Sequence, residues 1–241
     1  MGLFKKLFGK KGNTSNPSVS TPLTGSVGSN VITVIPYADG RIYTGEVDGI
    51  IPNGHGKMIF PNGNVYEGDF RIGIPNGQMK VIMSDGDTYE GLMKDGLKCG
   101  KGRYIWSSGL EYVGEWANDK RNGQGQLSTP SGVVYSGTWV NSRLSGYGTE
   151  VRPDGYTFAG IFENNEKKEG QETLPNGDVY EGPFLFGKAH GRGREITHDG
   201  AIYEGEFENG QYNGYGVLTT SDGIRHEGIF EKGYLAIVKI Q

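Results

Sequence analysis

Large rings recur along most of this chain at a fixed interval, with small and apolar residues in step with them. Each ring stands 23 residues after the last, apart from one interval of 22, and a glycine follows it after two residues and an apolar residue after four. Residues i, i+2 and i+4 share one face of a β-strand, because side chains alternate. The pattern therefore predicts one strand per repeat. The ring positions are Tyr43, Tyr66, Tyr89, Tyr112, Tyr135, Phe158, Tyr180, Tyr203 and His226.

A second strand completes each repeat. Most repeats carry a Gly-x-Gly pair, such as Gly54 and Gly56, followed by a short apolar run and a turn tripeptide such as Pro61-Asn62-Gly63. Asn-Gly and Asp-Gly supply the positive φ of tight reversals. The sequence thus predicts an all-β fold, an elongated single-layer antiparallel meander of tandem ~23-residue β-hairpins. About eight full repeats and terminal partial repeats fill residues 31–241.

Glycine provides 43 residues and only 34% of the chain is hydrophobic, so a deep core is short of material. A bare backbone lets a neighbouring ring lie flat across it. We expect these contacts between rings and glycines to replace a conventional interior.

Two stretches carry a family resemblance. Tyr112-Val-Gly-Glu-Trp116 followed by Asn122-Gly-Gln-Gly125 resembles the MORN repeat, and so does Tyr203-Glu-Gly-Glu-Phe207 followed by Asn213-Gly-Tyr-Gly216. The resemblance covers about residues 37–233. It implies repeats that serve as scaffolds for protein contacts, or for phospholipid contacts, with any catalysis in a separate domain.

The sixth and seventh repeats depart from the pattern. Phe158 replaces Tyr, Lys168 stands where the first glycine of the pair belongs, one residue is missing, and Pro183 lies inside a strand. Proline removes a hydrogen-bond donor from the sheet and indicates a bulge. We expect a bend or a specialised contact here, with repeat drift as the alternative.

The chain opens with a basic amphipathic segment, residues 1–11. Helical spacing places Leu3, Phe4, Leu7 and Phe8 on one side and Lys5 and Lys6 on the other, as in interfacial membrane helices. The alternatives are a disordered basic tail and a helix that docks on a partner. Residues 12–30 are rich in Ser, Thr, Asn, Gly and Pro, which predicts a disordered linker.

Charge and cysteine content narrow the function classes. Residues 1–30 carry a charge of +4 and the rest −8, which disfavours nucleic acid as a partner. Cys99 is the only cysteine and we find no secretory signal, so we expect a cytoplasmic protein that can associate peripherally with a membrane.

The stretches that resemble catalytic or cofactor motifs lack residues that those motifs require. Residues 182–189 nearly spell a phosphate-binding loop, but Ala189 replaces the required Ser or Thr and no helix follows. The four histidines lack metal-ligand spacing, and a free thiol is the simplest interpretation of Cys99. We expect no enzyme activity and no catalytic, cofactor or metal site.

Apolar runs stand at both ends of the repeats. Val31–Ile35 and Tyr234–Val238 are predicted capping strands. An open terminal edge could instead pair with a second copy and give a homodimer.

These features predict a non-catalytic protein-binding scaffold, tethered to a membrane surface by Leu3, Phe4, Lys5, Lys6, Leu7 and Phe8. Some rings are expected to hold the sheet together and others to remain exposed for a helix or extended peptide of a protein partner. The alternatives are a phospholipid-binding adaptor and a structural component of a cytoskeletal or ciliary assembly. The candidate partner-binding aromatics are Tyr112, Trp116, Tyr135, Trp139, Phe158 and Phe162.

Overall fold

The computed structural model describes residues 23–26 and 31–238, and all its regular elements are β-strands. The chain divides into two compact halves, an N-terminal half that ends at Gly125 and a C-terminal half that begins at Gln126. The described residues include no helix that is long and apolar enough to cross a membrane.

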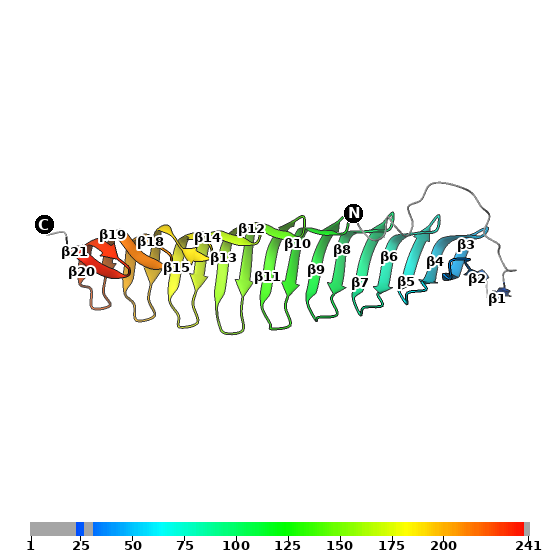
Figure 1. The fold of residues 1–241 in the computed structure, drawn as a ribbon, viewed down its shortest axis with the longest axis horizontal. Coiled ribbons are helices and arrows are strands. Elements are labelled where there is room, and N and C mark those ends of the chain that lie inside the picture. Colours follow the sequence, from blue (N-terminus) through cyan, green and yellow to red (C-terminus); the bar gives the residue numbers. More distant parts are fainter. Residues whose placement is uncertain (1–22, 27–30, 239–241) are drawn as a thin grey trace. The chain divides into compact units, whose positions relative to one another are not determined.

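Consecutive strands form the N-terminal half, and they are coloured blue to green in Figure 1. They are β1 (Leu23–Ser26), β2 (Val31–Pro36), β3 (Ile42–Asp48), β4 (Ile51–Ile59), β5 (Val65–Arg71), β6 (Ile74–Ile82), β7 (Thr88–Lys94), β8 (Leu97–Ile105) and β9 (Glu111–Ala117). β10 (Lys120–Ser128) lies across the division between the halves.

The C-terminal half follows the same order, and green passes to red along it in Figure 1. Its strands are β11 (Val134–Val140), β12 (Arg143–Val151), β13 (Thr157–Glu163), β14 (Glu166–Thr173), β15 (Val179–Leu185), β16 (Lys188–Ala189), β17 (Gly191–Ile196), β18 (Ile202–Glu208), β19 (Gln211–Thr219), β20 (Arg225–Glu231) and β21 (Tyr234–Val238).

Most repeats are hairpins with one bulge. In the first repeat, Tyr43 pairs with Met58 and Gly45 with Gly56, and the register then shifts by one residue before Val47. The same shift recurs between Gly205 and Phe207 in the eighth repeat. A bulge bends its strand and increases the twist. The predicted antiparallel hairpin meander is therefore confirmed within each half.

Two kinds of turn join the strands. The predicted Pro-Asn-Gly turn closes with Gly63 N–H donating to the Phe60 carbonyl at 2.9 Å. At the opposite end of the strands, most of the two-residue turns have both residues at positive φ, as at Asn164 (φ 53°) and Asn165 (φ 74°). This is the type I′ geometry, which matches the right-handed twist of paired strands. The sequence predicted a hairpin in each repeat but not the residues of this second turn; we call these turns the turn tips.

The ends of the repeats differ from expectation at one point. Leu23–Ser26, inside the expected linker 12–30, forms β1 and pairs antiparallel with β2. The predicted front cap Val31–Ile35 lies within β2, which pairs with both β1 and β3. Backbone hydrogen bonding to β2 suffices for a strand even in a Ser/Thr/Gly-rich segment. Residues 1–22, the amphipathic segment included, lie outside the described residues.

The predicted irregularity at Pro183 appears in the strand that follows it. Pro183 pairs with Glu169 inside β15, while the next strand is interrupted at His190 into β16 and β17. His190 N–H donates to the Pro183 carbonyl at 3.0 Å, and its buried Nδ1 has no hydrogen-bond partner among the described residues. The seventh hairpin is thus the least regular of the C-terminal half.

Candidate interaction surfaces

Most of the rings lie over a pair of glycines, which we call the glycine seat. A Cβ on Gly56 would overlap the hydroxyl and ring of Tyr43, so only glycine fits there. The hydroxyl then donates to the backbone carbonyl three residues after the ring, as from Tyr43 to Glu46 at 2.7 Å. Tyr89, Tyr112, Tyr180 and Tyr203 repeat this hydrogen bond. The predicted contact between rings and glycines is confirmed.

The rings also brace one another. Tyr203 meets Phe207 of its own repeat edge to face, with centroids 5.1 Å apart and planes at 87°. It meets Phe230 of the next repeat in the same way, at 5.0 Å and 81°. Such pairs contribute roughly 0.5–1.5 kcal/mol beyond the area they bury. The ladder of rings therefore links each hairpin to its neighbour within a half.

Burial of the rings corrects the expected exposed aromatic face. Tyr112 is 0% and Trp139 is 2% exposed, and the other candidates Trp116, Phe158 and Phe162 are buried as well. The expectation of exposure ignored three coverings: the glycine seat beneath each ring, the ring of the next repeat, and a further side chain that folds over the top. Direct partner contact by these five rings would require them to leave their seats.

Tyr135 is the exception among the six candidates. It is half-exposed, and its hydroxyl lies 3.5 Å from Glu150 Oε1 instead of bonding the carbonyl three residues on. Leu144 approaches both Gly137 and Gly148, the seat that Tyr135 would occupy, and is itself buried. The structure thus leaves Tyr135 as the one candidate aromatic with an accessible ring.

The side chain nine residues after the ring lies over it in the third, fourth, sixth and eighth repeats, and the chemistry of this side chain changes from repeat to repeat. We call this the covering position. It holds Pro52, Pro75, Lys98, Arg121, Leu144, Lys167, Ala189, Tyr212 and Leu235 in successive repeats. Tyr212 stacks on Tyr203 with centroids 3.7 Å apart. The covering position, rather than the ring, therefore gives each repeat its own surface chemistry.

Lys98 shows how a cation fills this position. Its ammonium lies 5.7 Å from the ring centroid of Tyr89, 5.2 Å from that of Tyr104 and 5.4 Å from that of Trp116. Asp119 pairs with it at 3.4 Å. Cations over aromatic faces are attracted by the ring quadrupole, by about 2 kcal/mol or more when desolvated. Lys98 therefore links the third repeat to the fourth through its contacts with the rings of both.

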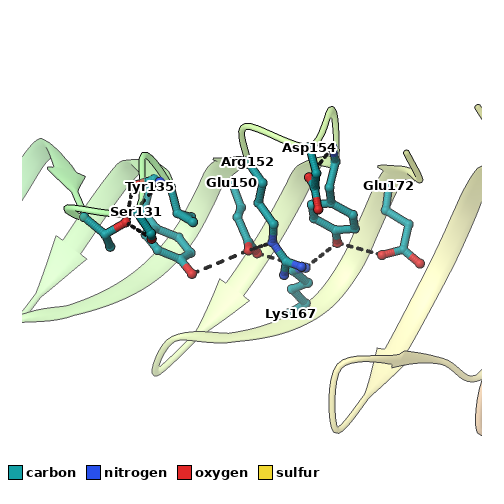
Figure 2. A network of polar contacts seen from close by, with 10 residues as sticks. Ser131, Tyr135, Glu150, Arg152, Asp154, Lys167 and Glu172 are labelled. Carbon is teal, nitrogen blue, oxygen red and sulfur yellow. Dashed lines mark hydrogen bonds and ion pairs between the residues drawn. The ribbon is translucent and has the colours of Figure 1, made fainter. Parts of the chain in front are cut away.

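A network of polar side chains replaces apolar packing in the fifth and sixth repeats (Figure 2). The buried carboxylate of Glu150 pairs with Arg152 at 2.6 Å and with Lys167 at 2.9 Å. Lys167 also donates to the Tyr156 hydroxyl, which donates to Glu172 at 2.7 Å. Burial favours neutral Glu150, but hydrogen bonds from Lys167 and Arg152 outweigh it and lower the pKa of Glu150.

Carboxylates recur along one row of the C-terminal half. Glu150, Glu172 and Glu195 each pair in register with ring positions on both neighbouring strands, such as Glu172 with Phe158 and with Tyr180. Equivalent residues of the N-terminal half are apolar or aromatic: Met58, Val81 and Tyr104. Burial, together with Asp178 and Glu172, raises the pKa of Glu195 against the opposing hydrogen bond from Tyr212.

Two turn tips carry large apolar side chains in water. Ile72 has φ 50° and is 69% exposed, and Phe186 has φ 50° and is 85% exposed. Left-handed backbone costs an L-residue roughly 1–2 kcal/mol, and β-branched and bulky residues are rare there. Other tips use residues that tolerate this conformation, such as Asn118, Asn141 and Asn209. Because both side chains are exposed and both backbones are strained, folding does not require Ile72 or Phe186 at these tips.

The remaining sequence features stay without a chemical site among the described residues. No group of His, Cys, Asp and Glu there is arranged to hold a metal ion. Cys99 is a half-buried free thiol whose pKa is raised by burial. The stretch resembling a phosphate loop, residues 182–189, runs through β15, a turn tip and β16.

Family comparison matches the repeats one by one. The MORN repeat matches residues 43–65, 66–88, 89–111, 112–134, 135–155, 180–202 and 203–225. The chain belongs to the MORN-repeat family. The match skips residues 156–179, which contribute Tyr156, Lys167 and Glu172 to the polar network. Part of the network and the departures of the sixth repeat therefore lie in the stretch that the family model does not match.

Comparison with solved structures finds other β-proteins. A variant of the TCP10 domain of Danio rerio CPAP is 12% identical, with a TM-score of 0.48 over 86% of this chain and 98% of that chain. The G-box domain of the microcephaly protein CPAP is 14% identical, with a TM-score of 0.43 over 83% and 99%. The Drosophila melanogaster SAS-4 TCP domain, in complex with a proline-rich motif of Ana2, is 12% identical, with a TM-score of 0.31 over 86% and 94%. At these values the likeness carries no information about function. Comparison with curated protein sequences gives no match.

Reasoning from the sequence missed the covering position and the turn tips. Both have a signal once the MORN repeats are aligned, because each is a column that varies far more than the ring and glycine columns do. The same alignment shows that most tips hold Asn, Asp or Gly, whereas Ile72 and Phe186 stand at two of them.

Proposed function

We propose that this MORN-repeat protein is a non-catalytic scaffold that binds a protein partner through its exposed variable positions. The observation that carries the proposal is Phe186, which is 85% exposed in a left-handed turn. Backbone strain at an exposed aromatic is retained where another purpose requires that residue. Exposed aromatic anchors supply much of the energy of protein interfaces.

Charge around Phe186 indicates the kind of partner. The neighbouring tips in sequence carry the exposed carboxylates Glu163, Glu166 and Glu208, against the cations Lys168, which pairs with the first two, and Lys188. Residues 126–241 hold 16 acidic and 10 basic side chains. We therefore infer a partner, a helix or an extended peptide, that offers an apolar contact flanked by Lys or Arg. Complementary charge raises association rates and excludes acidic competitors.

The substitution Phe186→Asn tests this proposal. Asparagine tolerates the left-handed turn, so we expect a thermal midpoint at least as high as that of the parent together with loss of the proteins recovered by affinity capture. Asn209→Gly, at another tip of the same half, is the matched control and should recover them unchanged. Undiminished recovery with Phe186→Asn would contradict the proposal.

A second candidate activity is peripheral membrane contact through Leu3, Phe4, Lys5, Lys6, Leu7 and Phe8. The apolar and basic sides of this segment favour it, as do the four lysines and the lack of acids in residues 1–30. We infer a cytoplasmic protein that associates with anionic lipid through this segment. Removal of residues 1–12 should abolish sedimentation with phosphatidylserine liposomes, and unchanged sedimentation would exclude the tether.

The proposal assigns no catalysis to the repeats. It also does not invoke pairing of the terminal strands, although β21 offers an edge for a second copy. A homodimer that dissociates when Tyr234–Val238 is deleted would add that activity to the scaffold.

A further inference from the structure

A groove crosses the start of the N-terminal half on the face opposite the rings. It has a volume of about 290 Å³, and its lining includes Ile32 of β2, Thr44, Gly45 and Glu46 of β3, and Gly56 of β4. Gly45 and Gly56 pair in register, so bare backbone forms its floor. Ile32, 54% exposed, is the large apolar side chain at its wall. Ligand pockets begin near this size, at about 300 Å³.

The rim of this groove is acidic. Glu46 and Glu67 contribute two carboxylates, and one cation, Lys57, lies 3.5 Å from Glu67. A larger groove of about 680 Å³ on the second to fourth repeats has balanced charge, with Glu90 and Glu115 against Lys101 and Arg103. The smaller groove therefore favours a cationic occupant and the larger one does not.

We propose that the N-terminal segment of this same chain, residues 3–11, docks in the groove of Ile32. Its apolar side chains Leu3, Phe4, Leu7 and Phe8 pack against Ile32 and the glycine floor, and its lysines face Glu46 and Glu67. The segment combines the two properties that the groove selects, because it has four large apolar groups, four lysines and no acid.

The length of chain between segment and groove permits this docking. Residues 12–22 precede β1, and eleven residues extend at most about 38 Å. β1, β2, β3 and β4 pair in sequence, so the groove lies within three strand spacings of β1, about 14 Å. The connecting chain therefore reaches the groove with slack.

While the segment is docked in the groove, its apolar side chains are inaccessible to lipid. An occupied groove and a membrane-bound segment are then alternatives, and anionic lipid shifts the equilibrium by binding only the released segment. The proposal predicts a self-shielded segment in the free protein.

Limited trypsin digestion of the full chain tests the docking without lipid. Cleavage after Lys5, Lys6, Lys10 and Lys11, followed by mass spectrometry, reports how often the segment is released. We expect Ile32→Ser to accelerate this cleavage about tenfold, which corresponds to about 1.4 kcal/mol of docking free energy. Ile161→Ser, at an equally apolar exposed position of β13 in the C-terminal half, is the control and should digest like the parent.

A second variant keeps the test decisive if Ile32→Ser disturbs β2. Thr44→Lys places a like charge at the rim and should also accelerate cleavage, more strongly in low salt than in high salt. Equal cleavage rates for the parent, Ile32→Ser and Thr44→Lys would overturn the proposal. Protection that grows with protein concentration would overturn it too, because the segment would then dock on another copy.

Discussion

At the scale of single residues, stability depends on how closely rings approach bare backbone. Gly56 lies beneath the Tyr43 ring, whereas Gly148 lies against Leu144 instead of the Tyr135 ring. The two glycines occupy the same column of the repeat and differ only in what covers them. They offer a paired test of the glycine seat.

Alanine at the two seats should have unequal effects. Gly56→Ala forces Tyr43 off its seat and should lower the free energy of unfolding by about 3 kcal/mol. A Cβ on Gly148 would meet the Ser136 carbonyl oxygen at 2.9 Å and Phe162 at 3.2 Å, so the backbone must shift, but the overlap is shallower than the 2.2 Å approach to Tyr43 at Gly56. Gly148→Ala should therefore cost less, about 1.5 kcal/mol. Chemical denaturation measures both, and equal losses would refute the seat.

The buried carboxylate Glu150 should stabilise the fold at neutral pH. Its pKa is lowered in the folded state, so its contribution is present above the unfolded value of about 4.3 and is lost as pH falls through the folded value. Glu150→Gln leaves Arg152 and Lys167 facing each other and should cost about 3 kcal/mol at pH 7. The cost should shrink toward pH 3 in denaturation curves. A constant difference across this range would contradict the assignment.

Glu195 should behave with the opposite sign. Burial raises its pKa in the folded state, so the charged form is a penalty above that value, and the penalty disappears as pH falls through it. Glu195→Gln should raise the thermal midpoint at pH 7, while Tyr212 can still donate to the amide oxygen. The gain should be absent at pH 3. Destabilisation at pH 7 would show that the charge itself is needed.

At the scale of the hairpin, the turn tips and the bulge define the element. Two residues at positive φ reverse the chain at most tips, and the bulge between the second and fourth residues past the ring bends the strand. Most tips satisfy this geometry with Asn, Asp or Gly. Ile72 does so at a cost, since a β-branched residue is strained there.

Ile72→Gly should stabilise the protein by relieving that strain. We expect a gain of about 1 kcal/mol in the free energy of unfolding, since glycine adopts the left-handed conformation freely. Asp95→Gly, at the next tip of the same half, replaces a residue that already tolerates the turn and should gain less than half as much. Loss of stability with Ile72→Gly would mean that the isoleucine packs in the folded chain.

At the scale of the whole molecule, the repeating columns could be predicted from the sequence and the varying columns could not. Ring, glycine and turn signals recur nine times, so strand pairing and the glycine seats followed from Tyr43 and its equivalents. Burial of the rings depends on the covering position, where Pro52, Lys98 and Tyr212 share no property that a pattern detects. Strand β1 depends on hydrogen bonding to β2, which its composition does not encode.

The same distinction separates structure from binding. Invariant columns hold each hairpin to the next, and a chain stabilised by neighbour contacts can vary its remaining positions freely. Phe186 and the polar network of the fifth and sixth repeats lie in columns that vary, and Tyr135 keeps the regular ring but loses its seat to Leu144 of the variable covering position. We therefore expect partner binding at the positions that vary from repeat to repeat.

Hydroxyl-radical footprinting of the full chain tests the central claim, that the repeating rings are buried structural groups. Comparison within one residue type removes differences in intrinsic reactivity. Tyr112 and Tyr203 should be oxidised at least tenfold more slowly than Tyr147 and Tyr234, which are exposed. Oxidation of Tyr112 and Tyr203 at the rate of Tyr147 would mean that the ring face is open, and the account of this fold would fail.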